Sequence, residues 1–379
     1  MNSLPRPPGG RRDGLRARFA LPCLILALVI ACGSVNAWAF DWDYSAFRFD
    51  LTETAVLGSA RDVTQWQEAP RQHFREQAAA VGGGPARLVS WTVTTDGGAT
   101  RKEAVVRFPG VTDSGADLDY HVVLLAPSKP RGGPRWPVVA LDGHGDVNGE
   151  GSGRAPKRMF TPGGFAHRLV EQGYTVIGIP TAVHKPFGQM AARVDYTVIW
   201  ARLARDALAI LRPQLPGSGP YYLAGNAIGG LTALSLAIID DGALALFVNG
   251  AFFPLELTRR EYRVKDHPLC HDYRAFNTYT AVYALLAPRP LMITMGRQDA
   301  LWLGHRSAPA SDWFSGMKRG ATVDETLGSF LVLKHIWRKF RAPIRLDVHP
   351  GQHEDIDSTA AGNFFRYAGP TAGSIERGQ

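Results

Sequence analysis

The stretch "YYLAGNAIGG", Tyr221–Gly230, has the pattern of a strand that turns sharply into a helix. Its first half is a largely apolar run, which is typical of a buried strand. Gly225, Gly229 and Gly230 then flank Ala227, so little side-chain bulk surrounds position 227. Glycines in such a place indicate a tight turn at which backbone segments approach one another closely. The stretch therefore predicts a strand–turn–helix unit with Ala227 at its tip.

Similar apolar runs and helical patterns alternate along most of the chain. The expected helices cover residues 69–80, 191–211 and 228–239, and a further helix begins at Thr161-Pro162 and ends at Gly173. The expected strands cover residues 88–95, 103–108, 119–127, 137–143, 174–180, 220–226, 245–250, 290–296 and 344–349. Repeated alternation of this kind predicts an α/β protein with a doubly wound, mostly parallel sheet and helices on both faces.

The first 39 residues have the layout of a secretory signal peptide. Five arginines precede the apolar run Phe19–Ala31, and Ala37-Trp38-Ala39 offers a cleavage site. The mature chain is then expected to begin near Phe40 and to be secreted or periplasmic. Two alternatives remain open: Cys32 follows a lipobox-like stretch and would anchor a lipoprotein, and an uncleaved leader would hold the chain at the membrane.

Composition describes a globular protein. Of the 379 residues, 45% are hydrophobic and 20% are charged, so the chain can bury a sizeable core. The leader carries five Arg and one Asp, which leaves 37 basic and 33 acidic residues in the mature chain. This small excess is no electrostatic footprint for nucleic acid. After cleavage Cys270 would be the one remaining cysteine, which excludes an internal disulfide.

The chain divides into three parts on its sequence. After the leader, residues 40–84 form an N-terminal extension that ends at three glycines, Gly82–Gly84. Residues 85–379 hold the main α/β domain. Within it the stretch 251–285 lies between two core strands, where we expect an inserted cap.

Chemistry-bearing residues follow three of the expected strands. In open α/β sheets, reactive groups collect at the carboxyl ends of the strands. Ala227 lies at the centre of the glycine-flanked turn, where the pattern G-x-S-x-G would place a nucleophile, and no other match to that pattern exists. Asp299 follows the strand 290–296, and His353 follows the strand 344–349. Nucleophile position, acid and base thus occur in the order of a hydrolytic triad.

The chain resembles an α/β-hydrolase of the dienelactone hydrolase and acetyl xylan esterase-like group. The resemblance covers about Val122 to Phe365 and rests on "LDGHGD", "LVEQGYTVIGIP", "AGNAIGG", "ALLAPRPLMITMGRQDAL" and "PGQHEDI". It implies the α/β-hydrolase fold and an esterase acting on small-molecule or carbohydrate esters. By the same resemblance, Asp299 orients His353, and His353 is the general base. The N–H of Ile228 and the loop with His144 and Gly145 would form the oxyanion hole.

Two positions depart from that group. Asp142 stands where a histidine usually opens the oxyanion loop, and Ala227 stands where the serine belongs. Without an oxygen or sulfur at 227 no acyl-enzyme can form, so the chain as written is inactive or nearly so. Three hypotheses follow. The chain is an altered copy of a serine esterase, a natural non-catalytic relative that binds a glycan, ester or protein partner, or an enzyme whose His353 and Asp299 activate water directly.

Further candidates lie in the expected cap and beside the acid. Phe252, Phe253, Tyr262 and Trp302 could line an apolar or sugar-stacking pocket, although ordinary core packing explains such aromatics equally well. His267, Cys270 and His271 lie close together, but their spacing fits no common metal site. We expect neither a metal nor another cofactor.

Overall fold

The computed structural model describes residues 49–96, 99–128, 136–143, 159–160, 162–181, 187–214, 219–252, 273, 275–276, 278–299, 323–352 and 355–368. Its strands form one nine-stranded sheet in the order β1-β2-β3-β5-β4-β6-β7-β8-β9. Neighbours from β5 to β9 run parallel, whereas β1, β2 and β3 form an antiparallel margin. The strands are β1 Arg87–Asp96, β2 Ala99–Phe108, β3 Leu118–Pro127, β4 Val138–Leu141, β5 Val176–Ile179, β6 Tyr221–Asn226, β7 Ala243–Asn249, β8 Leu291–Gly296 and β9 Ile344–His349.

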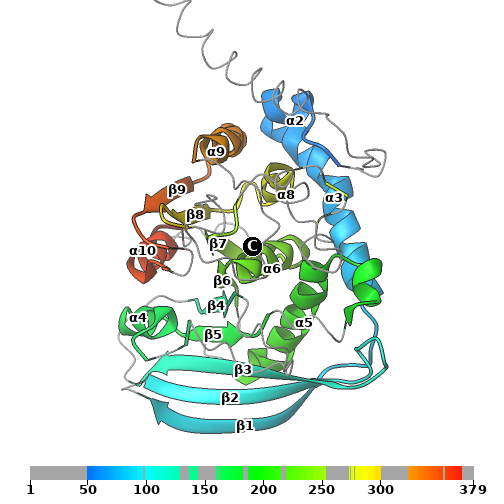
Figure 1. Cartoon of the computed structure of the whole chain (residues 1–379), viewed down its shortest axis with the longest axis vertical. Coiled ribbons are helices and arrows are strands. Elements are labelled where there is room, and N and C mark those ends of the chain that lie inside the picture. The colour runs from blue at the N-terminus through cyan, green and yellow to red at the C-terminus, as the bar shows by residue number, and fades with distance from the viewer. Residues whose placement is uncertain are drawn as a thin grey trace, which may run out of the picture.

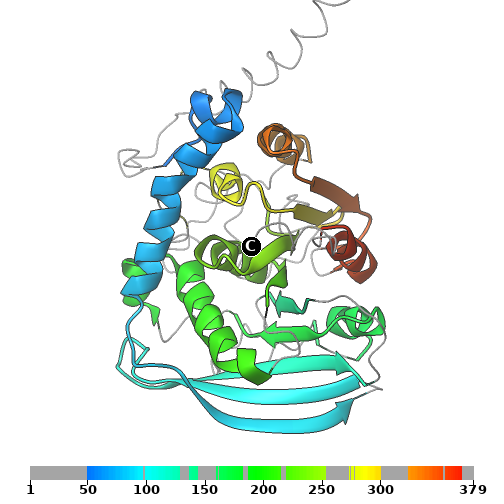
Figure 2. The same ribbon diagram turned by 180° about the vertical axis from the view of Figure 1, so that it is seen from behind.

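Helices cover both faces of the sheet, as the alternating pattern predicts (Figures 1 and 2). The helices α4 and α10 pack on one face, and α5, α6, α3 and α8 lie on the other. The bounds are α2 Glu53–Leu57, α3 Ala60–Ala80, α4 Phe165–Glu171, α5 Tyr196–Leu211, α6 Ile228–Ile239, α8 Tyr279–Ala284, α9 Val323–Lys339 and α10 Ser358–Ala368.

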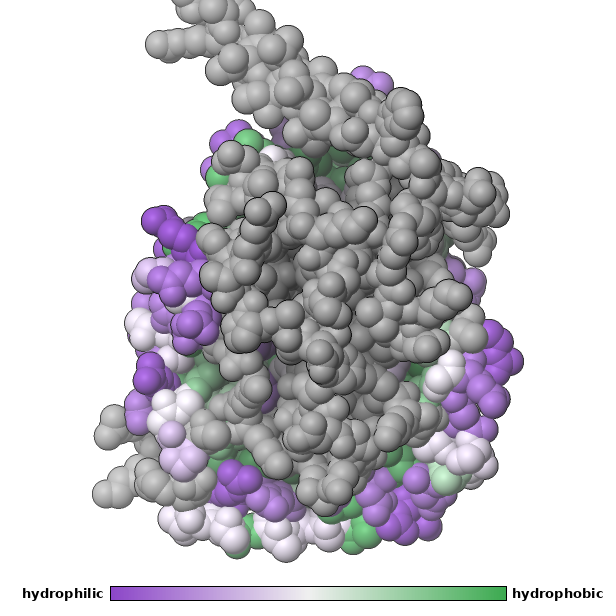
Figure 3. Space-filling model, in the orientation of Figure 1, coloured by the Kyte–Doolittle hydropathy of each residue, from purple (hydrophilic) through white to green (hydrophobic). Residues whose placement is uncertain are grey.

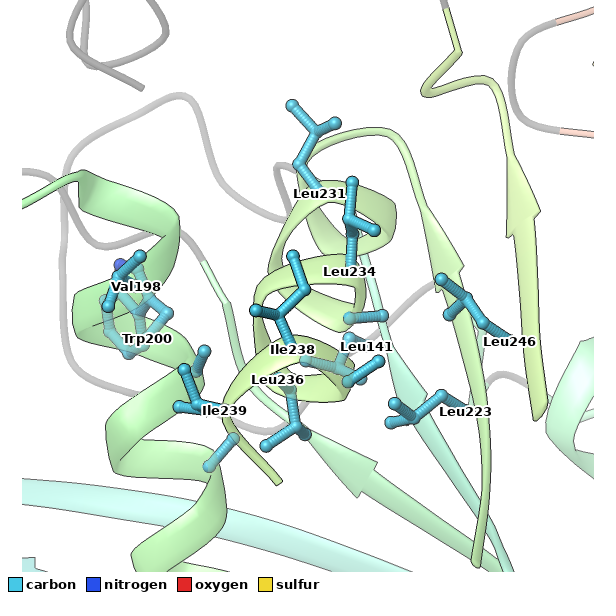
Figure 4. Close-up of a cluster of buried hydrophobic side chains, with 14 of the residues drawn as sticks. Leu141, Val198, Trp200, Leu223, Leu231, Leu234, Leu236, Ile238, Ile239 and Leu246 are labelled. Carbon is cyan, nitrogen blue, oxygen red and sulfur yellow. The ribbon is translucent and has the colours of Figure 1, made fainter. Parts of the chain in front are cut away.

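Two apolar layers hold the helices to the sheet. In the first, α6 is buried along its whole length between the strands and α5, and apolar residues occupy most of its surface. Figure 4 shows Leu234 and Ile238 of α6 close to Leu141, Leu223 and Leu246 of the central strands. In the second layer, on the opposite face, Phe365 of α10 stacks on Tyr222 with ring centroids 4.9 Å apart. This burial on both sides fixes α6, and with it the turn at residue 227.

The predicted starts of three helices are wrong. The helix expected at residues 69–80 begins at Ala60, because Ser59 and Asp62 form a reciprocal capping box and Pro70 is accommodated inside the helix. The helix expected from Thr161 begins at Phe165 with Gly164 as its N-cap. In addition, the helix expected from 191 begins at Tyr196, after a short 3₁₀ turn at Met190–Ala192. The sequence analysis missed α2, α8, α9 and α10 entirely.

The helix α3 is joined to the rest of the fold by polar side chains that meet helix ends. Gln67 is buried, and its Nε2 donates to the carbonyl oxygens of Ala284 and Ala287 at 2.7 and 2.9 Å. These carbonyls lie at and beyond the C-terminus of α8, where helical hydrogen bonds end. At the other end, the backbone N–H of Asp195, the N-cap of α5, donates to Gln77 Oε1 at 2.6 Å. The residues of α3 are therefore an integral part of the packed structure.

The expected leader and the start of the extension, residues 1–48, lie outside the described residues. Among the helices that are described, none is long and apolar enough to cross a membrane.

Candidate active site

The turn between β6 and α6 holds Ala227 in a strained conformation. Its backbone has φ 50° and ψ −123°, a region that residues with a Cβ rarely adopt. The strand ends at Asn226 and the helix begins at Ile228, so a single residue reverses the chain direction. This is the geometry that presents a nucleophile at the top of an α/β-hydrolase sheet. In this chain it presents the methyl group of alanine.

The flanking glycines are required by close contacts. A Cβ at Gly229 would lie 2.3 Å from the carbonyl oxygens of both Leu141 and Asp142. A Cβ at Gly225 would lie 2.4 Å from the carbonyl oxygen of Gly229, and one at Gly230 would lie 2.8 Å from the Cβ of Ala251. Real Cβ atoms do not approach other atoms so closely. The glycine spacing seen in the sequence thus reflects a turn packed tightly against β4 and β7.

The N-terminus of α6, with its first backbone amides, lies directly after Ala227. Ala227 is the N-cap, so the N–H of Ile228 belongs to the first turn, whose amides have no acceptor within the helix. Gly143, which follows β4, lies beside this turn: a Cβ built on it would be 3.4 Å from Ala227 Cβ. Two backbone segments therefore converge on the methyl group of Ala227. The other predicted oxyanion residues, His144 and Gly145, lie outside the described residues.

Asp142 has a structural role in this loop. Its side chain is buried, and its two carboxylate oxygens accept from the backbone N–H groups of Gly143 at 2.8 Å and Met159 at 3.0 Å. The hydroxyl of Thr181 also donates to the Asp142 carbonyl oxygen. Asp142, which departs from the family pattern, thus connects the start of the loop by hydrogen bonds to Met159 and Thr181.

A buried polar row runs behind the turn at the carboxyl ends of β6, β7 and β8. Asn226, Asn249 and Thr294 are register partners on adjacent parallel strands, so their side chains share one face of the sheet. Asn249 Nδ2 donates to Asn226 Oδ1 at 2.8 Å, and Thr294 Oγ1 donates to Asn249 Oδ1 at 2.8 Å. All three side chains are at most 4% exposed.

His349, the last residue of β9, continues this row. Its Nε2 lies 3.3 Å from Asn249 Oδ1, and its Nδ1 accepts from the N–H of Gly351 at 3.2 Å. Because an amide oxygen can only accept, this arrangement fits the neutral tautomer with the proton on Nε2. The row therefore links the residue before Ala227 to the loop that follows β9.

That loop runs alongside the loop that carries the predicted acid. The N–H of Arg297 donates to the His349 carbonyl oxygen at 2.7 Å, and the N–H of Gln298 donates to the Gly351 carbonyl oxygen at 3.0 Å. Asp299, the next residue, is fully buried, and its N–H donates to the Gly296 carbonyl oxygen at 3.1 Å. The predicted base, His353, lies outside the described residues. Gly351, which precedes it by two residues in the chain, pairs with Gln298, the residue before Asp299.

The remaining candidates are described in part. Phe252 is 3% exposed and packs edge-on against Tyr283, with ring centroids 5.1 Å apart, so its side chain belongs to the core. At the far end of the expected cap, Tyr279–Ala284 is also buried. Phe253, Tyr262, Trp302 and the group His267, Cys270 and His271 lie outside the described residues. Within the described part of the chain, no cluster of side chains could hold a metal ion.

Sequence reasoning missed Asn226, Asn249, Thr294 and His349 as a group. One signal was available: "YYLAGN" and "ALFVN" are largely apolar strands that both end on asparagine. A polar side chain at the last position of a buried strand must find a partner, and parallel neighbours offer one.

Comparison with known proteins gives matches in structure. No protein-family model and no curated protein sequence matches the chain. A glucuronoyl esterase from Solibacter usitatus matches with a TM-score of 0.56 at 14% identity, over 84% of this chain and 98% of that one. A protein assigned as an acetyl xylan esterase from Bacteroides fragilis matches with 0.54 at 13% identity, over 89% and 91%. A methylesterase matches with 0.55 at 13% identity over 82% of this chain, which spans 64% of that protein's length.

These neighbours are esterases, and at such low identity the similarity concerns the fold. It agrees with the nine-stranded, mostly parallel sheet and with helices on both of its faces. The chain has the α/β-hydrolase fold.

Proposed function

We propose that this protein is an exported carboxylic-ester hydrolase of the serine-esterase type in which Ala227 replaces the nucleophilic serine. The observation that carries the proposal is the backbone of Ala227, held at φ 50° and ψ −123° between glycines that tolerate no Cβ. A strained non-glycine residue costs about 1–3 kcal/mol and persists where function requires it. A chain long released from catalysis could have removed that strain with glycine at 227.

With a hydroxyl at position 227, the proposed triad would perform acyl transfer. Its oxygen would attack the ester carbonyl carbon while His353 takes the hydroxyl proton and Asp299 holds the imidazole in the productive tautomer. The N–H of Ile228 and the loop with His144 and Gly145 would receive the negative charge on the carbonyl oxygen. His353 would then pass the proton to the departing alcohol, and water would hydrolyse the acyl-enzyme. With alanine no such intermediate forms.

The substrate class follows from the neighbours. Their names include glucuronoyl esterase, methylesterase and acetyl xylan esterase, so we propose an ester of a carbohydrate as the parental substrate. A substrate of this class outside the cell would fit the predicted leader and a mature chain beginning near Phe40. Lipoprotein anchoring at Cys32 is the alternative form of export.

A second candidate function is binding without catalysis. It is favoured by Ala227 itself, since its methyl group leaves room for a ligand at the tip of the turn. On this alternative the pocket binds a glycan, an ester or a protein partner. Direct activation of water by His353 and Asp299 would retain only a small part of the rate, about 10³–10⁴-fold over the uncatalysed reaction.

The test compares the chain as written with Ala227→Ser on a short-chain aryl acetate and on methyl or acetyl esters of sugars. We expect Ala227→Ser to be faster by at least about 10³-fold, as for restored nucleophiles in other triads. Ala79→Ser adds the same oxygen on the exposed surface of α3 and should change nothing. Ala227→Ser/His353→Ala and Ala227→Ser/Asp299→Asn should return the rate to the alanine level or near it. If Ala227→Ser is folded and no faster than the alanine form, the binding function replaces the catalytic one.

A further inference from the structure

Among the described strands, β1 forms one edge of the sheet. It has β2 as its neighbour on one side and is the first strand of the sheet order (Figures 1 and 2). Every residue from Arg87 to Thr95 is exposed except Trp91, which is half-buried. Val89 and Val93 are 48% and 58% exposed. The lower margin of the molecule in Figure 3, where β1 lies, shows pale and green atoms among purple ones. An edge strand of this length presents unpaired backbone donors and acceptors to a further strand.

Natural edge strands are usually protected, and this one has little protection. The segment Leu88–Thr95 contains no charged residue and no proline, the two commonest protective features. Its protective feature is a β-bulge at Val89, where the register with β2 shifts. The opposite edge, β9, is shorter, largely half-buried and carries Arg345 and Asp347. The absence of protection at β1 indicates that the edge is occupied in the working protein.

A second copy of β1 complements this edge. When two identical strands pair antiparallel about a two-fold axis, one residue must lie opposite itself. After the bulge, the register with β2 is regular from Ser90 to Asp96, and the centre of that stretch is Val93. With Val93 opposite Val93, Thr92 lies opposite Thr94 and Trp91 lies opposite Thr95. Aromatic–β-branched and hydroxyl–hydroxyl pairs of this kind are the favourable cross-strand combinations.

The segment Leu88–Thr95 carries no charge, so no like charges oppose one another where the two copies pair. On the apolar face, Lys102 lies over the Trp91 ring at 5.6 Å from its centroid and leaves part of the ring exposed. Charge and side-chain size thus both permit the pairing.

We propose that β1 is a self-association edge, through which two copies of this chain join their sheets antiparallel about a two-fold axis at Val93. A contact made by one strand from each copy is smaller than a standard stable interface, so the dimer is weak and its population rises with concentration. This interaction is independent of the residue at position 227.

Cross-linking tests the register. In the full chain with Cys23, Cys32 and Cys270 replaced by serine, Val93→Cys should form a covalent dimer under mild oxidation. The two Cβ atoms at position 93 would be about 4.5–5.5 Å apart. Val89→Cys, the same exchange on the same exposed strand, is the matched control, because the two copies of position 89 would be more than about 20 Å apart. Equal cross-linking of both variants, or none of Val93→Cys, overturns the proposal.

Sedimentation velocity over a range of concentrations tests the association itself. The unmodified chain should show a monomer–dimer equilibrium that Val93→Lys abolishes, because the lysines of the two copies would lie directly opposite one another. Tyr367→Lys replaces another exposed hydrophobic residue, 80% exposed on α10, and should leave the dimer intact. Both substitutions are at exposed positions, so circular dichroism should show an unchanged fold. A monomer at all concentrations, or a dimer unaffected by Val93→Lys, contradicts the proposal.

Discussion

The side-chain amide of Asn249 donates to Asn226 Oδ1 at 2.8 Å and thereby joins the carboxyl ends of β6 and β7 directly behind Ala227. The side-chain Oδ1 of Asn249 accepts from the Thr294 hydroxyl and lies 3.3 Å from His349 Nε2. One buried amide thus connects the turn at 227 with the loops that follow β8 and β9. Its position explains how elements more than 100 residues apart in the chain hold a common geometry.

Asn249→Leu should therefore destabilise the fold strongly. The substitution leaves Asn226 and Thr294 buried without this partner, which costs about 2–4 kcal/mol in the free energy of unfolding. Denaturant unfolding measures the effect. Asn363→Leu, the same exchange at an exposed position of α10, should stay within about 0.5 kcal/mol of the original. An equally small effect of Asn249→Leu would show that the row carries no stability.

Gly229→Ala should be among the most damaging single changes in the turn. The new Cβ would meet two carbonyl oxygens at 2.3 Å, so β4 and α6 must separate, and we expect a loss of at least about 3 kcal/mol. At Gly82 a Cβ would have no atom within 4 Å, and Gly82→Ala should be neutral or slightly stabilising. Thermal unfolding of both variants distinguishes them. Similar melting temperatures would show that the close approach at Gly229 is wrong.

Ala227→Gly should stabilise the protein, against the usual effect of glycine. The left-handed backbone at 227 strains alanine and suits glycine, so the gain should be about 1 kcal/mol. In Ala79→Gly, at an exposed position within α3, the same exchange should instead cost about 0.5–1 kcal/mol. Denaturant midpoints of the two variants should thus shift in opposite directions. A shift in the same direction would contradict the strain at position 227.

Gln67→Leu should weaken the attachment of α3. The substitution removes both donors to the carbonyl oxygens of Ala284 and Ala287 and leaves those acceptors buried, at a cost of about 1–3 kcal/mol. Gln72→Leu, on the exposed side of the same helix, is the matched control and should have little effect. Limited proteolysis alongside unfolding would show whether α3 is released first. Equal stability of the two variants would mean that these hydrogen bonds are dispensable.

Stability should fall at alkaline pH because burial raises the pKa of several tyrosines. Burial raises the pKa of Tyr174 to about 12, and it raises the pKa values of Tyr120, Tyr221 and Tyr283 as well. In the unfolded chain these phenols titrate near pH 10, at about their ordinary value. Their contribution to stability is therefore complete below pH 10 and is lost as the pH rises through 12.

Denaturant unfolding between pH 9 and about 12 checks this dependence, with phenolate absorbance recorded in parallel. Tyr174→Phe removes one of the titrating groups and should make the fall in stability with pH less steep. An unchanged slope would show that Tyr174 does not contribute to the alkaline dependence.

The turn at 227 could be read from sequence because its cause is local. A strand that passes into a helix within one residue needs glycine where other backbone approaches it, and Gly225, Gly229 and Gly230 record that need directly. The strand order along the chain and the α/β class follow in the same way, because hydrophobic periodicity depends on near neighbours. The predicted start of α3 was wrong because Pro70 is a local signal for the start of a helix. The capping box of Ser59 and Asp62 begins the helix earlier, and Pro70 lies inside it.

The partners of polar residues were decided by the tertiary structure alone. Asn226, Asn249, Thr294 and His349 are separated by 23 to 123 residues in the chain and meet because parallel strands align their carboxyl ends. The residues around Asp142 in the sequence do not indicate that its carboxylate accepts from the Met159 N–H. Those around Gln67 do not indicate that its side chain donates to a carbonyl oxygen at the end of α8. The exposure of β1 likewise follows from its place at the sheet margin, since an alternating apolar pattern reads the same at an edge and in the interior. Local sequence determined which elements form, and packing between distant segments determined what each polar side chain does.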